Sequence, residues 1–397
     1  MRTQNFPTNS DPCRFNTERR GAKPTTLAGG ARGDGGVTGG AVRPSCAEFV
    51  PGARLERIGL VQRTTRQAGI PCRDPFGAEA VLTVNESTHL PVLVDEVVDA
   101  LRLRPGGVYV DATYGRGGHC AAILDHLGRE GRLLAFDRDP QAVAAARITF
   151  AGEARLSVVP APFSLMGQYL DKEGLTGRVN GIVFDLGVSS PQLEDHDRGF
   201  SFQHDGPLDM RMDPVTGISA AQWLDTAAEA EIVSVLFTLG EERYARRIAR
   251  AIVRERVGQR IETTRQLAQL VARVVPTRER TKHPATRTFL AIRLLVNQEL
   301  QELQAALPQA VQALAPEGRL VVISFHSLED RLVKRFVRAQ ARGDDFPPGV
   351  PVRAHELRPQ LKLIGKPLRP AGAEVQRNPR ARSAILRVAE RIGGDHA

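Results

Sequence analysis

The chain has 397 residues, enough for about two or three domains with a buried core, and a formal net charge of +9. No apolar run approaches the roughly 18 residues of a membrane span, and the N-terminus lacks the apolar segment of a secretory signal. The basic balance favours a polyanion such as RNA as the partner, because neutralising phosphates releases counterions. General solubility is the alternative reading of that charge.

The cysteines form no C-x-x-C pair and have no histidine at ligand spacing; they are Cys13, Cys46, Cys72 and Cys120. This pattern argues against a disulfide framework and against a metal site, and it favours a reducing cytoplasm.

Residues 1–85 are rich in Gly, Pro, Arg and Thr and show no sustained apolar periodicity. Such a segment buries too little apolar surface to offset its ordering entropy. We therefore expect a flexible extension, or a start assigned too far upstream. Ordered chain should begin near His89, and Val92, Val97 and Leu101 predict a first helix.

Apolar, β-branched runs predict five strands, with helical patterns between the first four; the strands are expected at about 108–111, 132–136, 155–159, 181–186 and 319–324. Alternation of strands and helices predicts a parallel, doubly wound α/β sheet. Asp139 and Pro140 are a typical helix start, with the acid as N-cap. A run at 383–390 predicts a last, antiparallel strand that completes a seven-stranded sheet.

Residues 198–295 have an almost purely helical pattern that is too long for a crossover. We expect an inserted all-helical domain between 86–197 and 296–392, which together form the sheet domain. Ligands of open α/β sheets bind beyond the carboxyl ends of the strands. An insert at this edge is expected to recognise substrate.

Local signals place helix starts within and after the insert. Thr226–Glu229 and Thr263–Thr264 each predict one, and His283 is expected to open a long helix to about Leu307. Ser327 is the expected N-cap of a helix that follows the fifth strand and runs to about Val337.

The most informative motif is a strand that ends at Asp111 and is followed by Gly115-Arg-Gly117-Gly118-His119; the next strand ends at Asp137. This is the opening βαβ unit of a nucleotide-binding fold. The spacing lacks the third glycine that a pyrophosphate site requires, so S-adenosylmethionine fits better than NAD. Gly117 and Gly118 would approach its methionine part, and Asp137 would accept the ribose hydroxyls. The alternative is that the glycines only permit a tight turn.

Asp185 ends the fourth strand and is the best candidate for a catalytic residue. Methyl transfer is an in-line displacement that depends on alignment. The acid would accept an N–H from an exocyclic base amine, hold the amino end of the cofactor, or simply cap the next turn. No Asn/Asp-Pro-Pro-aromatic sequence follows it, so these residues alone do not name the methyl acceptor.

The polar segment 198–213 is typical of a lid loop. Within it Phe200 and Phe202 would stack on an extruded base, and Arg211 would meet phosphate; ordinary packing of the two rings is an equal alternative. A helix predicted at 241–254 has a row of arginines along one side: Arg243, Arg247, Arg250 and Arg254. This cationic stripe would contact RNA, or it is only a solvent-exposed helix face. His326 lies near the predicted site but is interpreted as structural.

Together these motifs resemble the bacterial ribosomal RNA small-subunit methyltransferase H family, also called MraW, over residues 86–392. They include His89-Leu-Pro-Val-Leu, Gly115-Arg-Gly-Gly-His, Asp185-Leu-Gly-Val-Ser-Ser-Pro-Gln, Arg198-Gly-Phe-Ser-Phe, Ser324-Phe-His-Ser-Leu-Glu-Asp and Asn378-Pro-Arg-Ala-Arg-Ser. The resemblance implies a Rossmann-like class I S-adenosylmethionine-dependent methyltransferase sheet with an inserted all-helical domain. It also implies N4-methylation of a cytidine in the decoding region of 16S ribosomal RNA, within the small ribosomal subunit and in the cytoplasm.

The cofactor contacts that the resemblance implies are Gly117, Gly118, His119, Asp137, Phe163, Asp185 and Gln192. It assigns no general base and no oligomeric state. Two other classes stay open: a methyltransferase for a protein or small molecule, and a non-catalytic RNA-binding assembly factor. An NAD-dependent dehydrogenase is weakly supported because the pyrophosphate motif is missing.

Overall fold

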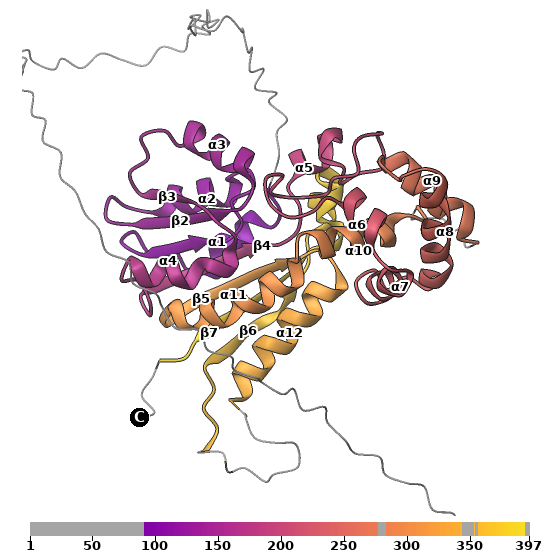
Figure 1. The fold of residues 1–397 in the computed structure, drawn as a ribbon. Coiled ribbons are helices and arrows are strands. Elements are labelled where there is room, and N and C mark those ends of the chain that lie inside the picture. The colour runs from indigo at the N-terminus through magenta and orange to yellow at the C-terminus, as the bar shows by residue number, and fades with distance from the viewer. Residues whose placement is uncertain (1–90, 277–282, 344–352, 354–355, 394–397) are drawn as a thin grey trace, which may run out of the picture. The chain divides into compact units, whose positions relative to one another are not determined.

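The computed structural model describes residues 91–276, 283–343, 353 and 356–393. The predicted N-terminal extension, 1–85, and His89 lie outside these residues. The described part contains a seven-stranded sheet with the order β3-β2-β1-β4-β5-β7-β6 (Figure 1). The strands are β1 Val108–Asp111, β2 Arg132–Asp137, β3 Leu156–Pro160, β4 Val179–Asp185, β5 Leu314–Ser324, β6 Leu361–Leu368 and β7 Ile385–Arg391.

The first five strands pair in parallel, and β7 runs antiparallel to both β5 and β6. This confirms the predicted Rossmann-like sheet with one antiparallel strand near its C-terminal edge. The predicted strand positions are also confirmed, although β5 begins earlier than expected, at Leu314.

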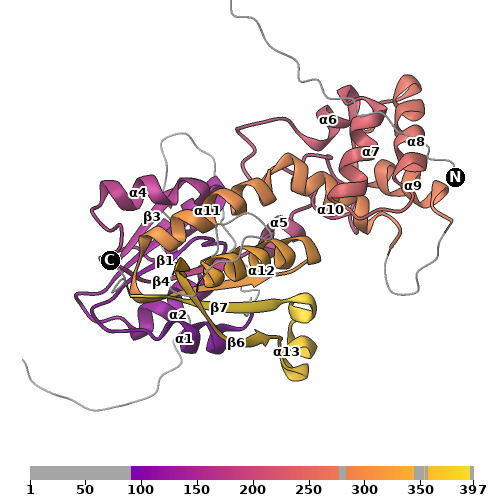
Figure 2. The same cartoon turned by 90° about the horizontal axis from the view of Figure 1, so that it is seen from below.

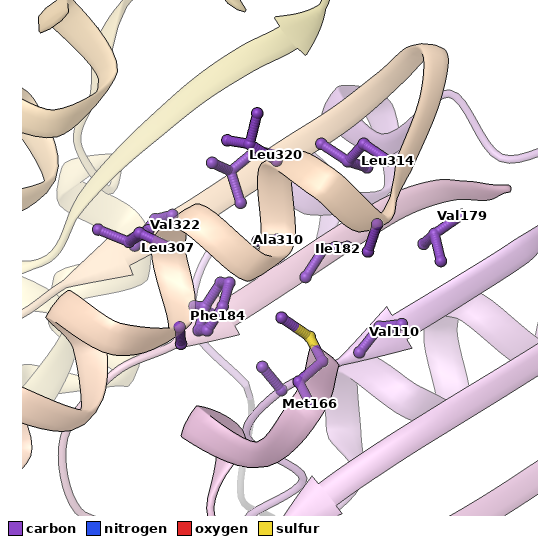
Figure 3. Close-up of a cluster of buried hydrophobic side chains, with 14 of the residues drawn as sticks. Val110, Met166, Val179, Ile182, Phe184, Leu307, Ala310, Leu314, Leu320 and Val322 are labelled. Carbon is purple, nitrogen blue, oxygen red and sulfur yellow. The ribbon is translucent and has the colours of Figure 1, made fainter. Parts of the chain in front are cut away.

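Helices cover both faces of the sheet, because successive strand residues point to opposite sides. Tyr109 and Val183 pack on one face, with α1, α2 and α3. Val110 and Phe184 pack on the other face, with α4, α11 and α12 (Figure 3). These helices are α1 Val94–Leu101, α2 Gly118–His126, α3 Pro140–Thr149, α4 Met166–Lys172, α11 Glu299–Ala313 and α12 Ser327–Arg342.

A second group of helices lies between β4 and α11 and has a hydrophobic cluster of its own, which includes Trp223, Ile248 and Ile292. Figure 2 shows α6 to α10 gathered together. The helices are α5 Ser190–Glu194, α6 Ala220–Thr226, α7 Glu229–Thr238, α8 Ala245–Gly258, α9 Thr264–Val274 and α10 Thr286–Val296. An insert with its own core agrees with the helical pattern, and the domain boundaries at 197/198 and 295/296 stay a prediction.

Four short segments complete the described elements: η1 Phe163–Leu165, η2 His196–Arg198, α13 Gly372–Arg377 and η4 Pro379–Ser383.

The long helix expected from His283 to Leu307 is wrong, because the chain breaks between α10 and α11. Gln298 adopts a left-handed backbone with φ of 51°. The side chain of Asn297 donates to the Met210 carbonyl at 2.7 Å and accepts from the Met212 amide at 2.7 Å. The break thus fastens the 198–213 loop to the start of α11.

Two predicted N-caps are also wrong. Thr226 ends α6, and α7 begins at Glu229 after Ala228, which provides no side-chain cap. His326, not Ser327, caps α12 in a reciprocal pair with Glu329, and the helix runs to Arg342. The predicted helix start near Thr263–Thr264 is confirmed: α9 begins at Thr264, and Thr263 caps it in a capping box with Gln266.

Candidate functional site

A cavity of about 220 Å³ lies at the carboxyl ends of the parallel strands. Its walls include Gly115 after β1, Asp137 at the end of β2, Phe163 after β3 and Asp185 at the end of β4. This is the edge at which open α/β sheets bind ligands.

The loop after β1 is organised by Asp111, which is completely buried. Its carboxylate accepts from the Thr113 amide at 3.0 Å and from the Cys120 thiol at 3.1 Å. Burial raises the pKa of Asp111. The Thr113 hydroxyl accepts from the Asp185 amide at 2.7 Å. These bonds fix the end of β1 against the end of β4.

The two glycines of the loop have different surroundings. Gly117 has φ of 76° and caps α2, and a Cβ there would lie 2.7 Å from the Tyr114 ring. Gly117 is not among the residues that line the cavity, and its contact with the cofactor stays a prediction. Gly118 does line it, and a Cβ there would lie 2.6 Å from the Pro91 ring. A side chain at Gly118 would therefore displace Pro91 from the cavity wall.

Asp137 is held by backbone amides: Oδ2 accepts from Gly115 at 2.8 Å and Oδ1 from Asp139 at 2.9 Å. Burial raises the pKa of Asp137 to about 6, although these bonds act in the opposite direction. Each carboxylate oxygen has a further lone pair. The side chain thus fits a ligand with adjacent hydroxyl groups.

Asp185 and His119 form a pair beside the loop, in which His119 is buried and Asp185 is partly exposed. His119 Nε2 lies 3.0 Å from the Val92 carbonyl, to which it donates, and Nδ1 lies 3.6 Å from Asp185 Oδ2. Burial raises the pKa of Asp185 to about 6. Asp185 Oδ1 is buried and has no hydrogen-bond partner among the described residues. Buried polar atoms are rarely left unpaired, so this oxygen fits a ligand that brings a donor.

Phe163 and Gln192 also line the cavity. Phe163 packs edge-to-face on Phe184, with centroids 5.6 Å apart. The Gln192 amide accepts from the Ser189 amide at 2.9 Å and donates to Asp139 at 2.8 Å. Gln192 thus links the start of α5 to the start of α3.

Asp139 is the confirmed N-cap of α3, and it has a second role that the sequence did not reveal. Its carboxylate accepts from the Gln141 amide at 3.0 Å and forms a buried ion pair with Arg198 at 2.9 Å. Arg198 also donates to the Met212 carbonyl at 2.7 Å. The 198–213 segment is therefore anchored to the sheet domain at both ends, and Met212 lines the cavity.

The predicted substrate residues lie away from the cavity lining. Phe200 is 7% exposed within the helical cluster, so its proposed stacking on a base is not supported. Phe202 packs on His283 and Phe289, with centroids 4.7 and 4.8 Å away. Arg211 pairs with Asp209 at 2.7 Å.

The helix predicted at 241–254 begins later, at Ala245, so Arg243 precedes α8 and is not part of a helical stripe. Arg247, Arg250 and Arg254 are exposed on α8, whereas Ile248 and Ile252 are buried. Arg250 is 4.0 Å from Glu229 and its side chain is 76% exposed. Arg247 is also exposed. Their contact with RNA stays a prediction.

The family model of the MraW methylase family matches residues 86–392. The chain belongs to the MraW methylase family. It is a methyltransferase whose methyl donor is S-adenosylmethionine. Within the described residues, none of the helices combines the length and apolar character needed to span a bilayer. In the same residues, no group of three or more His, Cys, Asp or Glu side chains is arranged to hold a metal ion.

Three solved structures are similar to the chain at low identity. A protein from Clostridium thermocellum assigned as an rRNA methylase is 14% identical, covers 77% of this chain and 100% of its own, and has a TM-score of 0.37. A protein from Streptococcus mutans assigned as a methyltransferase and solved with SAH is 12% identical, with 77% and 100% covered and a TM-score of 0.35. An rRNA methylase from Streptococcus thermophilus is 11% identical, with 77% and 99% covered and a TM-score of 0.35.

Proposed function

We propose that the protein transfers a methyl group from S-adenosylmethionine to N4 of a cytidine in the decoding region of 16S ribosomal RNA, within the small ribosomal subunit and in the cytoplasm. Membership of the MraW family supports ribosomal RNA methylation. The observation that carries the finer proposal is the unpartnered Oδ1 of Asp185 at the cavity. A methyl acceptor with an N–H would satisfy it.

The residues of the cavity fit the cofactor. Asp137 would accept the ribose hydroxyls, Phe163 would cover a face of the adenine, and the loop at Gly118 and His119 would hold the methionine end. Gln192 would act chiefly by fixing α5 against Asp139. When bound, S-adenosylmethionine supplies an electrophilic methyl group on its sulfonium.

Asp185 would act on the acceptor. The lone pair of an exocyclic base amine is delocalised into the ring, so the amine is a poor nucleophile. An ionised carboxylate that accepts its N–H raises its reactivity and can take the proton at Oδ1 as the new bond forms. A pKa of about 6 leaves Asp185 mostly ionised at pH 7 and still basic enough for this role. His119 Nδ1 lies 3.6 Å from the other carboxylate oxygen, Oδ2.

The RNA itself would be held by exposed cations. Arg247 and Arg250 on α8 are our proposal for phosphate contacts, since both are exposed on one side of the helix. Phe202 and Arg211 would need to leave their present partners to contact RNA.

The test uses labelled S-adenosylmethionine, the purified protein and small subunits from a strain that lacks the enzyme. Mass spectrometry of the digested RNA should show N4-methylcytidine at one decoding-region site. Label in another nucleoside would refute the N4-cytidine proposal. Label in protein only would favour the alternative acceptor class, and cofactor binding with no transfer to subunits would favour an assembly factor.

A further inference from the structure

Glu302 on α11 has a carboxylate oxygen, Oε2, that is buried and has no hydrogen-bond partner among the described residues. The same side chain lines the cavity. An unpaired buried carboxylate oxygen loses the hydrogen bonds that water would provide. Like Asp185 Oδ1, it fits a ligand that supplies a donor.

The direction of α11 places Glu302 at the ligand edge of the sheet. Because α11 leads directly into β5, its N-terminal end lies near the carboxyl ends of the parallel strands. Gln309, two turns further along α11, donates to the Ser164 carbonyl at 2.7 Å and accepts from the Gly167 amide at 2.7 Å. Residues two turns apart share a helix face. Glu302 therefore lies on the side of α11 that faces η1, which begins at Phe163.

Two other charged residues of this region line the cavity, and both have partners: Arg138 donates to the Asn297 carbonyl at 2.8 Å, and Glu299 pairs with Arg293 at 2.8 Å. The remaining wall beside Glu302 is apolar. Ala161, Pro162 and Phe163 follow β3, and Leu303 is the neighbour of Glu302 on α11; all four line the cavity. None of their side chains has a hydrogen-bonding group. A flat, apolar ring with a single amine at its edge matches an aromatic wall that carries one free carboxylate.

We infer that Glu302 accepts a hydrogen bond from the 6-amino group of the cofactor adenine. It is thereby a specificity-determining residue, which selects adenine over a base with a carbonyl at that position. The inference concerns the cofactor and holds whichever nucleotide accepts the methyl group.

The test compares the binding of S-adenosylhomocysteine and S-inosylhomocysteine to the full-length protein by calorimetry. The two ligands differ only at the base, where a carbonyl replaces the 6-amine and N1 gains a hydrogen. The wild type should prefer the adenine ligand by about tenfold or more, the range of a hydrogen bond to a charged group. In Glu302→Ala this preference should collapse, mainly because the adenine ligand binds more weakly. Glu302→Gln should also reduce the preference, because an amide can donate to the carbonyl.

Two control variants distinguish recognition of the 6-amino group from a general effect on cofactor binding or stability. Gln301→Ala removes an exposed neighbour on α11 and should leave both affinities and the melting temperature unchanged. Asp137→Asn should weaken both ligands equally, which keeps their ratio. If Glu302→Ala weakens both ligands by the same factor, Glu302 contacts another part of the cofactor and the inference fails. It also fails if neither affinity changes in a variant that melts like the wild type.

Discussion

The two regions of the molecule use their polar side chains in opposite ways. At the sheet edge, Asp111 is buried and Asp137 is partly buried, and both accept hydrogen bonds from backbone amides. Asp185 and Glu302 each leave an unpaired oxygen at the cavity. In the helical region, the buried cluster is apolar, and the arginines of α8 are exposed to solvent. Chemistry requires fixed groups shielded from water, whereas attraction of a polyanion needs only accessible charge.

Replacing Asp185 gives the largest effect that we expect. Asp185→Asn keeps the size of the side chain but removes the proton acceptor, so kcat should fall by about 10² to 10⁴. Single-turnover methylation of small subunits measures this loss, and calorimetry with S-adenosylhomocysteine is the control. A loss of cofactor affinity with unchanged single-turnover rate at saturation would instead assign Asp185 to the amino end of the cofactor.

The buried pair of Asp139 and Arg198 should be the most sensitive link between the regions. Asp139→Ala leaves Arg198 buried without its partner, and we expect the free energy of unfolding to fall by about 3–5 kcal/mol. Denaturant unfolding measures it. The exposed pair of Arg273 and Glu255 provides the control, because Glu255→Ala should cost no more than about 1 kcal/mol. Equal losses in the two variants would contradict the assigned role of Asp139.

The activity and the stability should both depend on pH, because the pKa values of Asp137 and Asp185 are raised to about 6. Methylation needs the ionised acids, so kcat/KM should level off above pH 7 and fall by at least about tenfold per unit well below pH 6. The stability of the free protein should change in the other direction. Between the unfolded pKa near 3.8 and pH 6 the folded state binds the extra protons, so the free energy of unfolding decreases as pH rises. A rate that does not vary between pH 5 and 7 would show that neither carboxylate must be ionised.

The arginine stripe should give the smallest effect. Arg247→Ala with Arg250→Ala removes two exposed charges, so the slope of log K against log salt for RNA should flatten by about 1.5. Lys172→Ala with Arg178→Ala is the matched control, because both residues are exposed before β4, at the opposite edge of the sheet. Equal changes of the salt slope in the two double variants would show that the arginine stripe is only a solvent-exposed surface.

Prediction from sequence succeeded where local pattern is sufficient. Apolar runs that end in an acid located β1, β2 and β4, and the same acids Asp137 and Asp185 were expected at one edge of a parallel sheet. Strand alternation and connection length determine these features, so no distant contact is needed to infer them.

The features that sequence could not predict depend on contacts between distant segments. The helix break at Asn297 is stabilised by Met210 and Met212, far away in the chain. Phe200 lies in an apolar cluster that only the folded insert creates. In the sequence, Glu302 is one of several polar residues of a helix, and only the direction of α11 in the fold places it at the cavity.

The role of Asp185 in N4-methylation is tested by mapping the methyl group in a strain that lacks the protein. Wild type and Asp185→Asn would be supplied at equal levels, and ribosomal RNA digested for mass spectrometry. We expect N4-methylcytidine at one decoding-region position to return with the wild type and not with Asp185→Asn. Full methylation by Asp185→Asn, or none at that position with the wild type, would contradict this expectation.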